Sequence, residues 1–541
     1  MSVAVADAER FRAEGWWRDR TAIDDLRAAV ERHPGKTAFV ARSLGRDETV
    51  TLTFDELLRR TDRCAGGLLA LGVEPGDVVT LQLPNWWELV VLSLACTRIG
   101  AVVGPVMPIM RRREMRHALG LTEAPVCVVP GVWRGFDHAA MLDELAGELP
   151  SLRHVVVVGE PRPGQVGFDE HFGRAWEDEH PASALDALAP DPDAPAQILF
   201  TSGTTGEPKG VLHTHNTLDA AMRGEPEALG LTGDDVITMG SPMTHQAGYL
   251  YCMLMPIALG ATAVLQDVWD ADVLLDHVAE HRVTFTMGAP PFVLDTIAAQ
   301  RREQRDVSSL HSFACGSAPV PPHVVEEVME VLGARLHALW GMTENGTVTI
   351  TRPEDPPMLA ADSDGSPIPW MEVRIVDDGG APVAEGEVGR LLVRGASQCA
   401  GYYRRPEVYA AALDDEGWFD TGDLARSDGH GGIRIAGRLK DLVMRGGENI
   451  PVLEVEAALY RHPRVREVAI VGYPDERLGE RACAFVAAEG EPPDLPELQR
   501  HLDAAGMARQ FWPERLELVD ELPKTPSGKV QKFQLRERLA G

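Results

Sequence analysis

A short apolar run, Ile198 to Phe200, leads directly into Thr201–Gly210, which reads T-S-G-T-T-G-E-P-K-G. These ten residues hold three glycines, three threonines, one serine and one lysine. Glycine lets the backbone turn tightly around an anion, exposed N–H groups and hydroxyls donate hydrogen bonds, and Lys209 adds a positive charge. The transition from strand to loop therefore predicts a phosphate site in an α/β protein. The alternative is an ordinary surface hairpin, for which such a composition is also typical.

Two common nucleotide motifs do not fit this loop. A Walker A loop needs G-x-x-x-x-G-K-[ST], but here Glu207 and Pro208 separate Gly206 from Lys209. The dinucleotide fingerprint G-x-G-x-x-G is also missing from this stretch. If the loop binds phosphate, its motif is therefore neither a Walker A loop nor a dinucleotide fingerprint.

Length and charge limit the possible functions. A chain of 541 residues is too long for one hydrophobic core, so two or more domains are expected. The apolar content of 44% and charged content of 25% are ordinary for a globular protein. With 52 basic and 82 acidic residues, the formal charge is −30. Such a surface repels nucleic acids and anionic membranes, which excludes both as partners.

Cysteine usage and the N-terminus predict a cytoplasmic protein. The seven cysteines are odd in number, and no C-x-x-C occurs, so neither a zinc site nor a disulfide framework is expected. The first residues lack the basic and apolar regions of a signal peptide. Leu89–Met110 is apolar and long enough to span a membrane, but Arg98 interrupts it. We interpret it as a buried helix, capped by Asn85, followed by a buried strand.

Most of the chain alternates between helical and strand-like patterns, which predicts parallel sheets covered by helices. The expected helices are 54–71 and 216–222, and the expected strands are 78–81, 126–129, 155–158, 236–239 and 283–286. Residues 373–393 are rich in strands and turns, which predicts a smaller β subdomain. After residue 439 come a helix (453–459), a strand (468–471) and a second helix (495–505), enough for a separate α+β domain.

Two further segments carry side chains suited to a nucleotide. Ala338–Gly346, A-L-W-G-M-T-E-N-G, combines an aromatic ring for stacking with a hydroxyl and a carboxylate for phosphate and metal. Trp418–Leu424, W-F-D-T-G-D-L, places an aspartate at a glycine turn, where it can accept ribose hydroxyls. Taken alone, the first segment is better explained by a buried tryptophan before a turn, and the second by an ordinary β-turn.

Two segments near the C-terminus are equally ambiguous alone. Gly437–Glu456 contains Gly446–Gly447, a pair that lets another chain approach the backbone closely, although a glycine turn before a helix is the alternative. Leu522–Lys532, L-P-K-T-P-S-G-K-V-Q-K, has the composition of a solvated terminus.

Taken in order, these five segments resemble the motifs of the adenylate-forming superfamily: acyl-CoA synthetases, adenylation domains of peptide synthetases, and luciferases. The resemblance covers roughly Pro34 to Lys532. It implies a large N-terminal domain (1–439) of α/β sheets with a β subdomain, which binds ATP and the acid. It also implies a small mobile α+β domain (440–541), which carries the catalytic lysine and the CoA tunnel.

The resemblance implies a two-step reaction. A carboxylate attacks the α-phosphate of Mg·ATP to give acyl-AMP and pyrophosphate, and the CoA thiol then displaces AMP. A carboxylate is already a nucleophile, so alignment and charge stabilisation are the main catalytic needs. Between the steps the C-terminal domain would rotate about Lys440. ATP, Mg²⁺ and CoA are the expected cofactors or co-substrates.

The same resemblance implies the site residues. Those expected to be catalytic are Lys529, Thr343, His245 and Lys209, and those expected to hold the metal are Glu344 and Thr201. Those expected to bind the nucleotide or CoA are Thr201, Ser202, Gly203, Thr204, Thr205, Gly206, Gly316, Ser317, Ala318, Trp340, Gly341, Met342, Asp423, Ile435, Arg438, Lys440, Gly446 and Gly447. Those expected to line the acid pocket are His245, Ala247, Gly248, Tyr249, Gly316, Gly341 and Gly346.

The acid is expected to be hydrophobic: bulky alicyclic, aromatic, terpenoid or medium-chain, from fatty acid or secondary metabolism. The small side chains at Ala247 and Gly248 indicate a roomy pocket. The sequence departs from the family pattern at Ser317, Met107–Pro108 and Asn345–Thr347, all near the expected pocket. Alternatives are a ligase that loads a carrier protein, a luciferase-like oxygenase, and a non-catalytic nucleotide-binding scaffold. A homodimer and a monomer are both left open.

Two histidine patterns resemble metal sites. His277–His281 fits H-x-x-E-H, but its helix should pack an apolar face into the core. His213–Asn216 is better explained by Thr214 or Asn216 capping the following helix. Neither predicts a metal centre.

Overall fold

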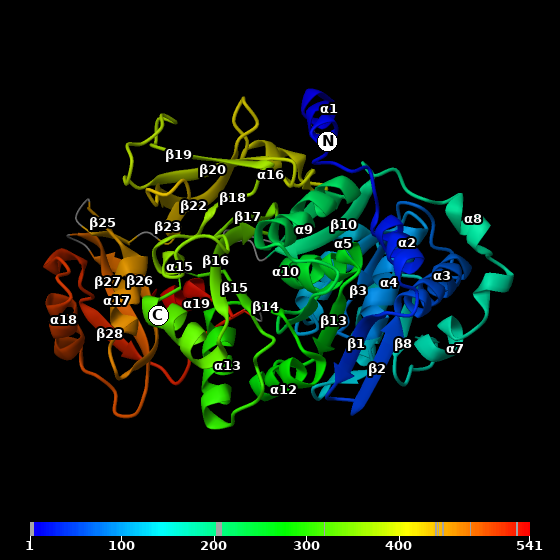
Figure 1. Ribbon diagram of the computed structural model, residues 1–541, viewed down its shortest axis with the longest axis horizontal. Coiled ribbons are helices and arrows are strands. Elements are labelled where there is room, and N and C mark those ends of the chain that lie inside the picture. The colour runs from blue at the N-terminus through cyan, green and yellow to red at the C-terminus, as the bar shows by residue number, and fades with distance from the viewer. Residues whose placement is uncertain are drawn as a thin grey trace.

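The computed structural model describes residues 5–201, 208–318, 320–438, 441, 443–445, 448–475, 478–525 and 528–540. Figure 1 shows the large N-terminal part on the right, a β subdomain above it, and the C-terminal domain in orange and red at the left. Two large sheets form the N-terminal part, as the alternating pattern predicts.

One large sheet carries the phosphate loop and has the described strand order β21-β11-β10-β4-β3-β5-β8-β9. Its strands are β3 (Val78–Leu81), β4 (Val102–Pro105), β5 (Val126–Pro130), β8 (His154–Val158), β9 (Val166–Gly167), β10 (Pro195–Thr201), β11 (Lys209–Thr214) and β21 (Gly401–Tyr402). The inner strands are parallel, while β11 returns antiparallel to β10. The phosphate loop therefore joins two hydrogen-bonded neighbours.

The other large sheet has the order β18-β17-β16-β15-β14-β12-β13-β1-β2 among described strands. Its strands are β1 (Thr37–Ser43), β2 (Glu48–Thr53), β12 (Val236–Met239), β13 (Thr262–Gln266), β14 (Phe285–Gly288), β15 (Ser312–Cys315), β16 (Arg335–Met342), β17 (Gly346–Ile350) and β18 (Ser366–Pro367). The strand expected at 283–286 begins two residues later, at Phe285, although the Thr284 N–H already donates to the Val236 carbonyl of β12.

Two smaller sheets complete the described structure, together with the hairpin β6 (Val132–Trp133) and β7 (Phe136–Asp137). The β subdomain contains β19 (Met371–Val376), β20 (Gly389–Gly395), β22 (Phe419–Ser427) and β23 (Ile433–Arg438). The C-terminal sheet contains β24 (Val443–Arg445), β25 (Glu448–Ile450), β26 (Val465–Asp475), β27 (Gly479–Ala488) and β28 (Arg515–Leu518). The β-rich region and the α+β C-terminal domain both match the prediction.

Helices pack on these sheets (Figure 1), and one of them, α9, contacts strands of both large sheets. They are α1 (Val5–Ala13), α2 (Ala22–Arg32), α3 (Phe54–Ala70), α4 (Trp87–Arg98), α5 (Arg112–Thr122), α6 (His138–Leu145), α7 (Phe168–Phe172), α8 (Ala182–Asp186), α9 (His215–Leu229), α10 (Gln246–Gly248), the π-helix η3 (Tyr249–Leu254), α11 (Met255–Leu259), α12 (Ala271–His281), α13 (Pro290–Arg302), α14 (Pro322–Glu327), α15 (Leu359–Asp362), α16 (Pro406–Ala410), α17 (Val452–Tyr460), α18 (Leu495–Ala504) and α19 (Lys532–Ala540).

The apolar segment 89–110 forms the buried helix α4 and the buried strand β4. Arg98 is 1% exposed, and its guanidinium pairs with Asp62 and Asp186. The predicted cap is wrong: Trp86 precedes α4 without a side-chain bond, and the Asn85 amide bonds Ser241 and Met243 instead. None of the helices in the described part of the chain is both long and apolar enough to span a membrane.

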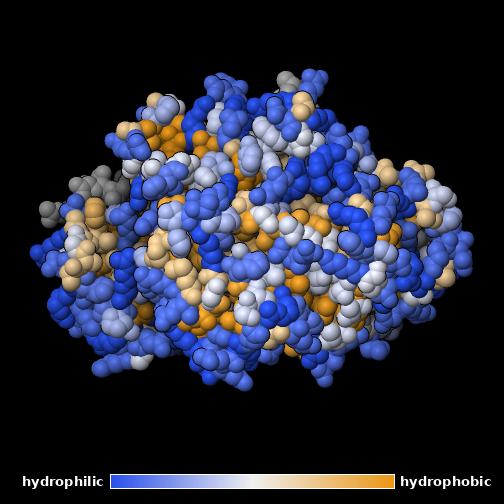
Figure 2. Space-filling view, viewed as in Figure 1, coloured by the Kyte–Doolittle hydropathy of each residue, from blue (hydrophilic) through white to orange (hydrophobic). Residues whose placement is uncertain are grey.

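The C-terminal domain packs around its own apolar cluster, in which α17 and α18 cover β26 and β27. A separate core fits a domain that can move as a unit. On the face in Figure 2, hydrophilic residues predominate and hydrophobic residues form small scattered groups, in keeping with the charge of −30.

Candidate active site

The ribose end of the candidate site joins three elements. The Trp340 indole N–H on β16 donates to the Asp423 carboxylate on β22 at 2.9 Å, and Arg438 on β23 pairs with the same carboxylate at 2.8 Å. Asp423 is 4% exposed, so both contacts fix its orientation. The sequence predicted each residue separately but not that Trp340 orients Asp423.

The candidate metal ligand Glu344 has a partner that the sequence did not reveal. The Tyr402 hydroxyl on β21 donates to Oε1 of Glu344 at 2.8 Å, and the Lys209 ammonium lies 4.7 Å from the Tyr402 ring centroid. Burial raises the pKa of Glu344, while the Tyr402 hydrogen bond and Lys209 lower it. Bringing a cation to this buried carboxylate would favour its ionised form.

Thr343 and the ends of the phosphate loop meet at β11. Nε2 of His213 donates to the Thr343 carbonyl at 2.8 Å, and its Nδ1 lies 3.0 Å from the Thr217 hydroxyl. Burial lowers the pKa of His213 to about 4, so this imidazole is neutral. Thr201 pairs with Lys209 across β10 and β11, so the two loop ends lie side by side.

The expected adenine wall consists of backbone held close to β16. A Cβ at Gly316 would lie 2.6 Å from Cδ1 of Leu339, so a larger residue there would require the Leu339 side chain to move. Ser317 stands where the family often has glycine. It adopts φ 74°, a left-handed conformation that is unfavourable for residues other than glycine. Ala318 is exposed next to it. At Gly341 an added Cβ would lie 2.2 Å from the Gly346 carbonyl oxygen.

The C-terminal tail reaches the N-terminal domain at the start of α13. A Cβ added at Gly528 would lie 3.5 Å from Cβ of Ala289 and 3.6 Å from Cγ of Pro291, at the start of α13. Burial, and then the Lys529 ammonium, lower the pKa of His245 to about 4. Lys529 and His245, far apart in the sequence, are therefore electrostatically coupled.

Residues expected in the acid pocket lie on different sides of α10 and η3. A Cβ at Gly248 would lie 2.2 Å from the Pro242 carbonyl, so this glycine serves backbone packing. Tyr249 is 3% exposed and lines a small cavity with Thr97 of α4 and Met222 of α9. Ala247 is partly buried against the main apolar cluster.

The remaining expected residues divide into two groups. Met342 and Ile435 are partly buried against the main apolar cluster, and the Ile435 N–H donates to Asp364. Eight candidates lie outside the described residues: Ser202, Gly203, Thr204, Thr205, Gly206, Lys440, Gly446 and Gly447. The domain boundary at 439/440 also falls there and stays a prediction.

The two histidine patterns take structural positions. Thr214 caps α9, with its hydroxyl accepting from the Thr217 N–H. His277 is 5% exposed within α12. Among described residues, no group of three or more His, Cys, Asp or Glu side chains is arranged to hold a metal ion.

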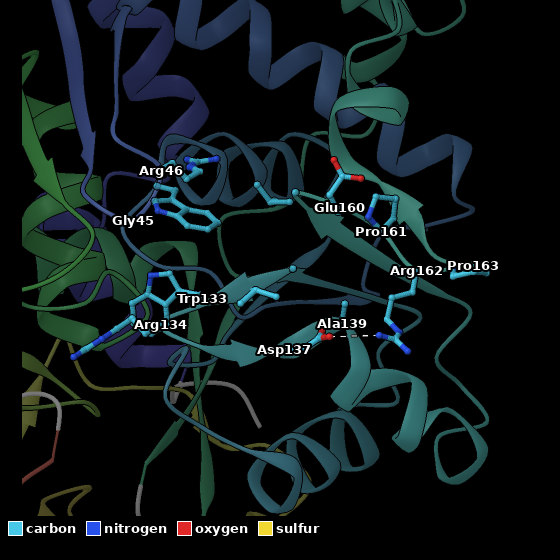
Figure 3. Close-up of a pocket in the computed structure, with 15 residues that line it drawn as sticks. Gly45, Arg46, Trp133, Arg134, Asp137, Ala139, Glu160, Pro161, Arg162 and Pro163 are labelled. Carbon is cyan, nitrogen blue, oxygen red and sulfur yellow. Dashed lines mark hydrogen bonds and ion pairs between the residues drawn. The ribbon is translucent and has the colours of Figure 1, made fainter.

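A cavity of about 670 Å³ opens elsewhere, where the β1–β2 turn meets the ends of β5 and β8 (Figure 3). Arg46 pairs with Glu88, and Arg162 pairs with Asp143 and Asp137, so these guanidiniums already have acidic partners. None of the expected site residues lines this cavity.

Comparisons with known proteins agree with this geometry. A family model described as AMP-binding enzyme matches residues 26–403, and one described as AMP-binding enzyme C-terminal domain matches 454–529. The chain belongs to the AMP-binding enzyme family. It is therefore an adenylate-forming ligase that binds ATP and activates a carboxylic acid, and other matched structures hold ATP. The predicted superfamily and fold class are confirmed.

The ligase has relatives with two kinds of acyl acceptor. It is 34% identical to a medium-chain fatty-acid–CoA ligase of Escherichia coli, over 97% of this chain and 92% of the relative. It is 35% identical to a salicyl-AMP ligase / salicyl-S-ArCP synthetase of Mycobacterium tuberculosis, with the same coverage. The anthranilate CoA ligase AuaEII with anthranoyl-AMP matches with a TM-score of 0.86 at 27% identity, covering 96% of this chain and 98% of that one.

Proposed function

We propose that the ligase is an ATP- and Mg²⁺-dependent acyl-CoA synthetase for a bulky hydrophobic acid. The observation that carries the proposal is the tail, in which Gly528, directly before Lys529, packs on Ala289 and Pro291 of the N-terminal domain. That arrangement suits the first step, in which a cation must meet the carboxylate and the α-phosphate together.

In the first step an oxygen of the acid attacks the α-phosphorus of ATP, the bond to the β-phosphate breaks, and pyrophosphate leaves. Lys529 and Thr343 contact the charge that develops at the α-phosphate, while Lys209 and the loop from Thr201 hold the outer phosphates. Asp423 accepts hydrogen bonds from the ribose hydroxyls. The contacts of Trp340 and Arg438 with the Asp423 carboxylate hold it in position for this.

A Mg²⁺ ion fits the donor set at Glu344. This carboxylate is 7% exposed, lies near Lys209 and Tyr402, and would be satisfied by a cation that also binds phosphate oxygens. Glu344 and Thr201 would hold the ion, which neutralises phosphate charge when bound. The Tyr402 hydroxyl orients the carboxylate from the other side.

In the second step the CoA thiolate attacks the acyl carbonyl, and AMP leaves. The C-terminal domain turns about Lys440, withdraws Lys529 and presents Gly446–Gly447 to the pantetheine arm. The neutral His245 separates the acid pocket from the thiol path. Similarity to a CoA ligase over 97% of the chain is compatible with CoA, and equal similarity to a carrier-protein ligase makes that acceptor the alternative.

The acid is proposed to be aromatic, alicyclic, terpenoid or medium-chain. Support comes from relatives named for salicylate and for medium-chain fatty acids, and from a matched structure named for anthranilate.

A panel of carboxylic acids, assayed for ATP–pyrophosphate exchange and then for thioester formation with CoA, tests this function. Lys529→Ala should lower exchange by roughly 10²–10³-fold, as for the loss of one charge-stabilising donor. Gly447→Trp should keep exchange but lose thioester formation. Thioester formed only on a phosphopantetheinyl carrier protein, and none on CoA, would replace the proposed acceptor.

A further inference from the structure

Glu225 on α9 is a fully buried carboxyl that the proposed reaction does not use. It is 0% exposed, and its Oε1 accepts a hydrogen bond of 2.6 Å from the Thr347 hydroxyl. Its Oε2 is buried without a hydrogen-bond partner among the described residues. An ionised carboxylate would leave an unsolvated charge on that oxygen, so the geometry fits the neutral acid. Consistent with this, burial raises the pKa of Glu225 to about 8.

Glu225 belongs to a network that holds the turn before β17. The Tyr251 hydroxyl on η3 donates to the Ala221 carbonyl at 3.2 Å and accepts from the Thr347 N–H at 2.8 Å. Gly346 directly precedes Thr347 and has φ +65°, and a Cβ there would lie 2.9 Å from Cβ of Ala221. The turn therefore sits tightly against α9, with Glu225 bonded on one side and Tyr251 on the other.

We propose that Glu225, as a neutral acid, is a positioning residue that fixes the Gly346–Thr347 wall of the acid pocket, and that its ionisation loosens this wall and weakens acid binding at alkaline pH. The inference rests on the proposed function, which places Gly346 in that pocket. An ionised Glu225 would draw water or new donors towards Oε2, and the close packing of α9 on Gly346 could not persist around them.

The neighbouring groups whose pKa is shifted do not titrate in the same range as Glu225. Strand β17 carries no ionisable side chain. Burial raises the pKa of each ionisable group of η3 well above neutral and lowers that of the β11 histidine to about 4. The ionisable groups of these packed elements are Tyr249, Tyr251, Cys252, His213 and Lys209.

The test measures ATP–pyrophosphate exchange from pH 6.5 to 9.5 without CoA, so that thiol ionisation plays no part. The acid is salicylate or decanoate, whichever supports exchange, and both are fully ionised throughout. In the wild type, the KM for the acid should rise on the order of tenfold above pH 8 while kcat changes much less. Glu225→Gln keeps a neutral hydrogen-bonding group and should show a flat KM.

Glu227→Gln is the matched control, since Glu227 lies on the same helix, is exposed and pairs with Arg223. It should keep the wild-type rise. Thr347→Val removes the hydrogen bond that lowers the pKa of Glu225, so the KM rise should move to higher pH. This variant carries the test if Glu225→Gln does not fold.

A flat wild-type KM, or a rise that persists in Glu225→Gln, overturns the inference. A rise at unchanged pH in Thr347→Val overturns it as well. Failure of the wild type to exchange pyrophosphate with any acid at any pH would instead refute the proposed function, so the two failures are distinguishable.

Discussion

The buried Glu225 carboxyl also predicts how stability depends on pH, without any substrate. Its pKa rises from 4.5 to about 8 through burial, and the Thr347 hydroxyl opposes the rise. Between these values the unfolded chain has lost the proton and the folded chain still holds it. The unfolded state therefore binds fewer protons, and the free energy of unfolding falls as the pH rises through this window.

The size of the fall follows from the pKa. A difference of one bound proton changes the free energy of unfolding by ~1.4 kcal/mol for each pH unit. Between pH 6 and pH 8 the free energy of unfolding should therefore fall by about 2 kcal/mol, since the folded carboxyl is half ionised only at pH 8. Glu225→Gln has no such proton. Over this range its free energy of unfolding should therefore fall by about 2 kcal/mol less than that of the wild type.

Urea unfolding at pH 6, 7 and 8, followed by tryptophan fluorescence, measures the difference. Other titrating groups are common to both proteins and cancel in the comparison. Glu227→Gln, on the exposed side of the same helix, should follow the wild type at each pH. Parallel curves for the wild type and Glu225→Gln would mean that Glu225 is already ionised when folded, and the reasoning would be refuted.

Two further substitutions test the contacts at the nucleotide. Tyr402→Phe removes the hydroxyl that donates to Glu344 and raises the pKa of that carboxyl further. Pyrophosphate exchange should then need roughly tenfold more Mg²⁺. An unchanged Mg²⁺ titration would contradict this expectation. Asp423→Asn removes the negative charge that pairs with Arg438 and accepts the hydrogen bond from Trp340. In the same assay, the KM for ATP should rise roughly tenfold to a hundredfold, with a smaller change in kcat.

The sequence predicted the fold well where local patterns decide it. Strands β3 and β5 and the helix α3 lie within a residue of their expected ranges, because alternation and apolar spacing act over a few neighbours. The prediction that Asn85 caps α4 was wrong, because the Asn85 amide forms hydrogen bonds with the backbone of Ser241 and Met243 instead. Those partners are more than 150 residues away, and no local signal reveals them.

The candidate site shows the same division. Short motifs predicted Trp340, Asp423 and Glu344 as nucleotide-site residues, because each motif lies in one stretch of chain. The supporting side chains Tyr402 and His213 were missed as partners, since each contact joins segments that only the tertiary structure brings together. Any motif that supplies one half of a long-range hydrogen bond leaves the other half unspecified.

The tail offers a final prediction that separates the two chemical steps. Gly528 has φ +81° and directly precedes Lys529, so a left-handed backbone sets the direction in which the chain enters the lysine. Gly528→Ala adds a Cβ at 3.5 Å from Ala289, an ordinary contact, and the cost is the backbone strain of about 1–2 kcal/mol. The loop should relax, carry Lys529 away and slow adenylation by roughly 5–30-fold.

Thioester formation from a synthetic acyl-AMP and CoA should be unchanged in Gly528→Ala, because that step does not use Lys529. Gly490→Ala is the matched control, since Gly490 has φ +70° in the same domain and its added Cβ meets nothing within 4 Å. It carries the same strain far from the lysine and should leave both steps intact. Equal loss of both steps in Gly528→Ala would show that the glycine supports the fold of the domain, and that Lys529 placement is not what it controls.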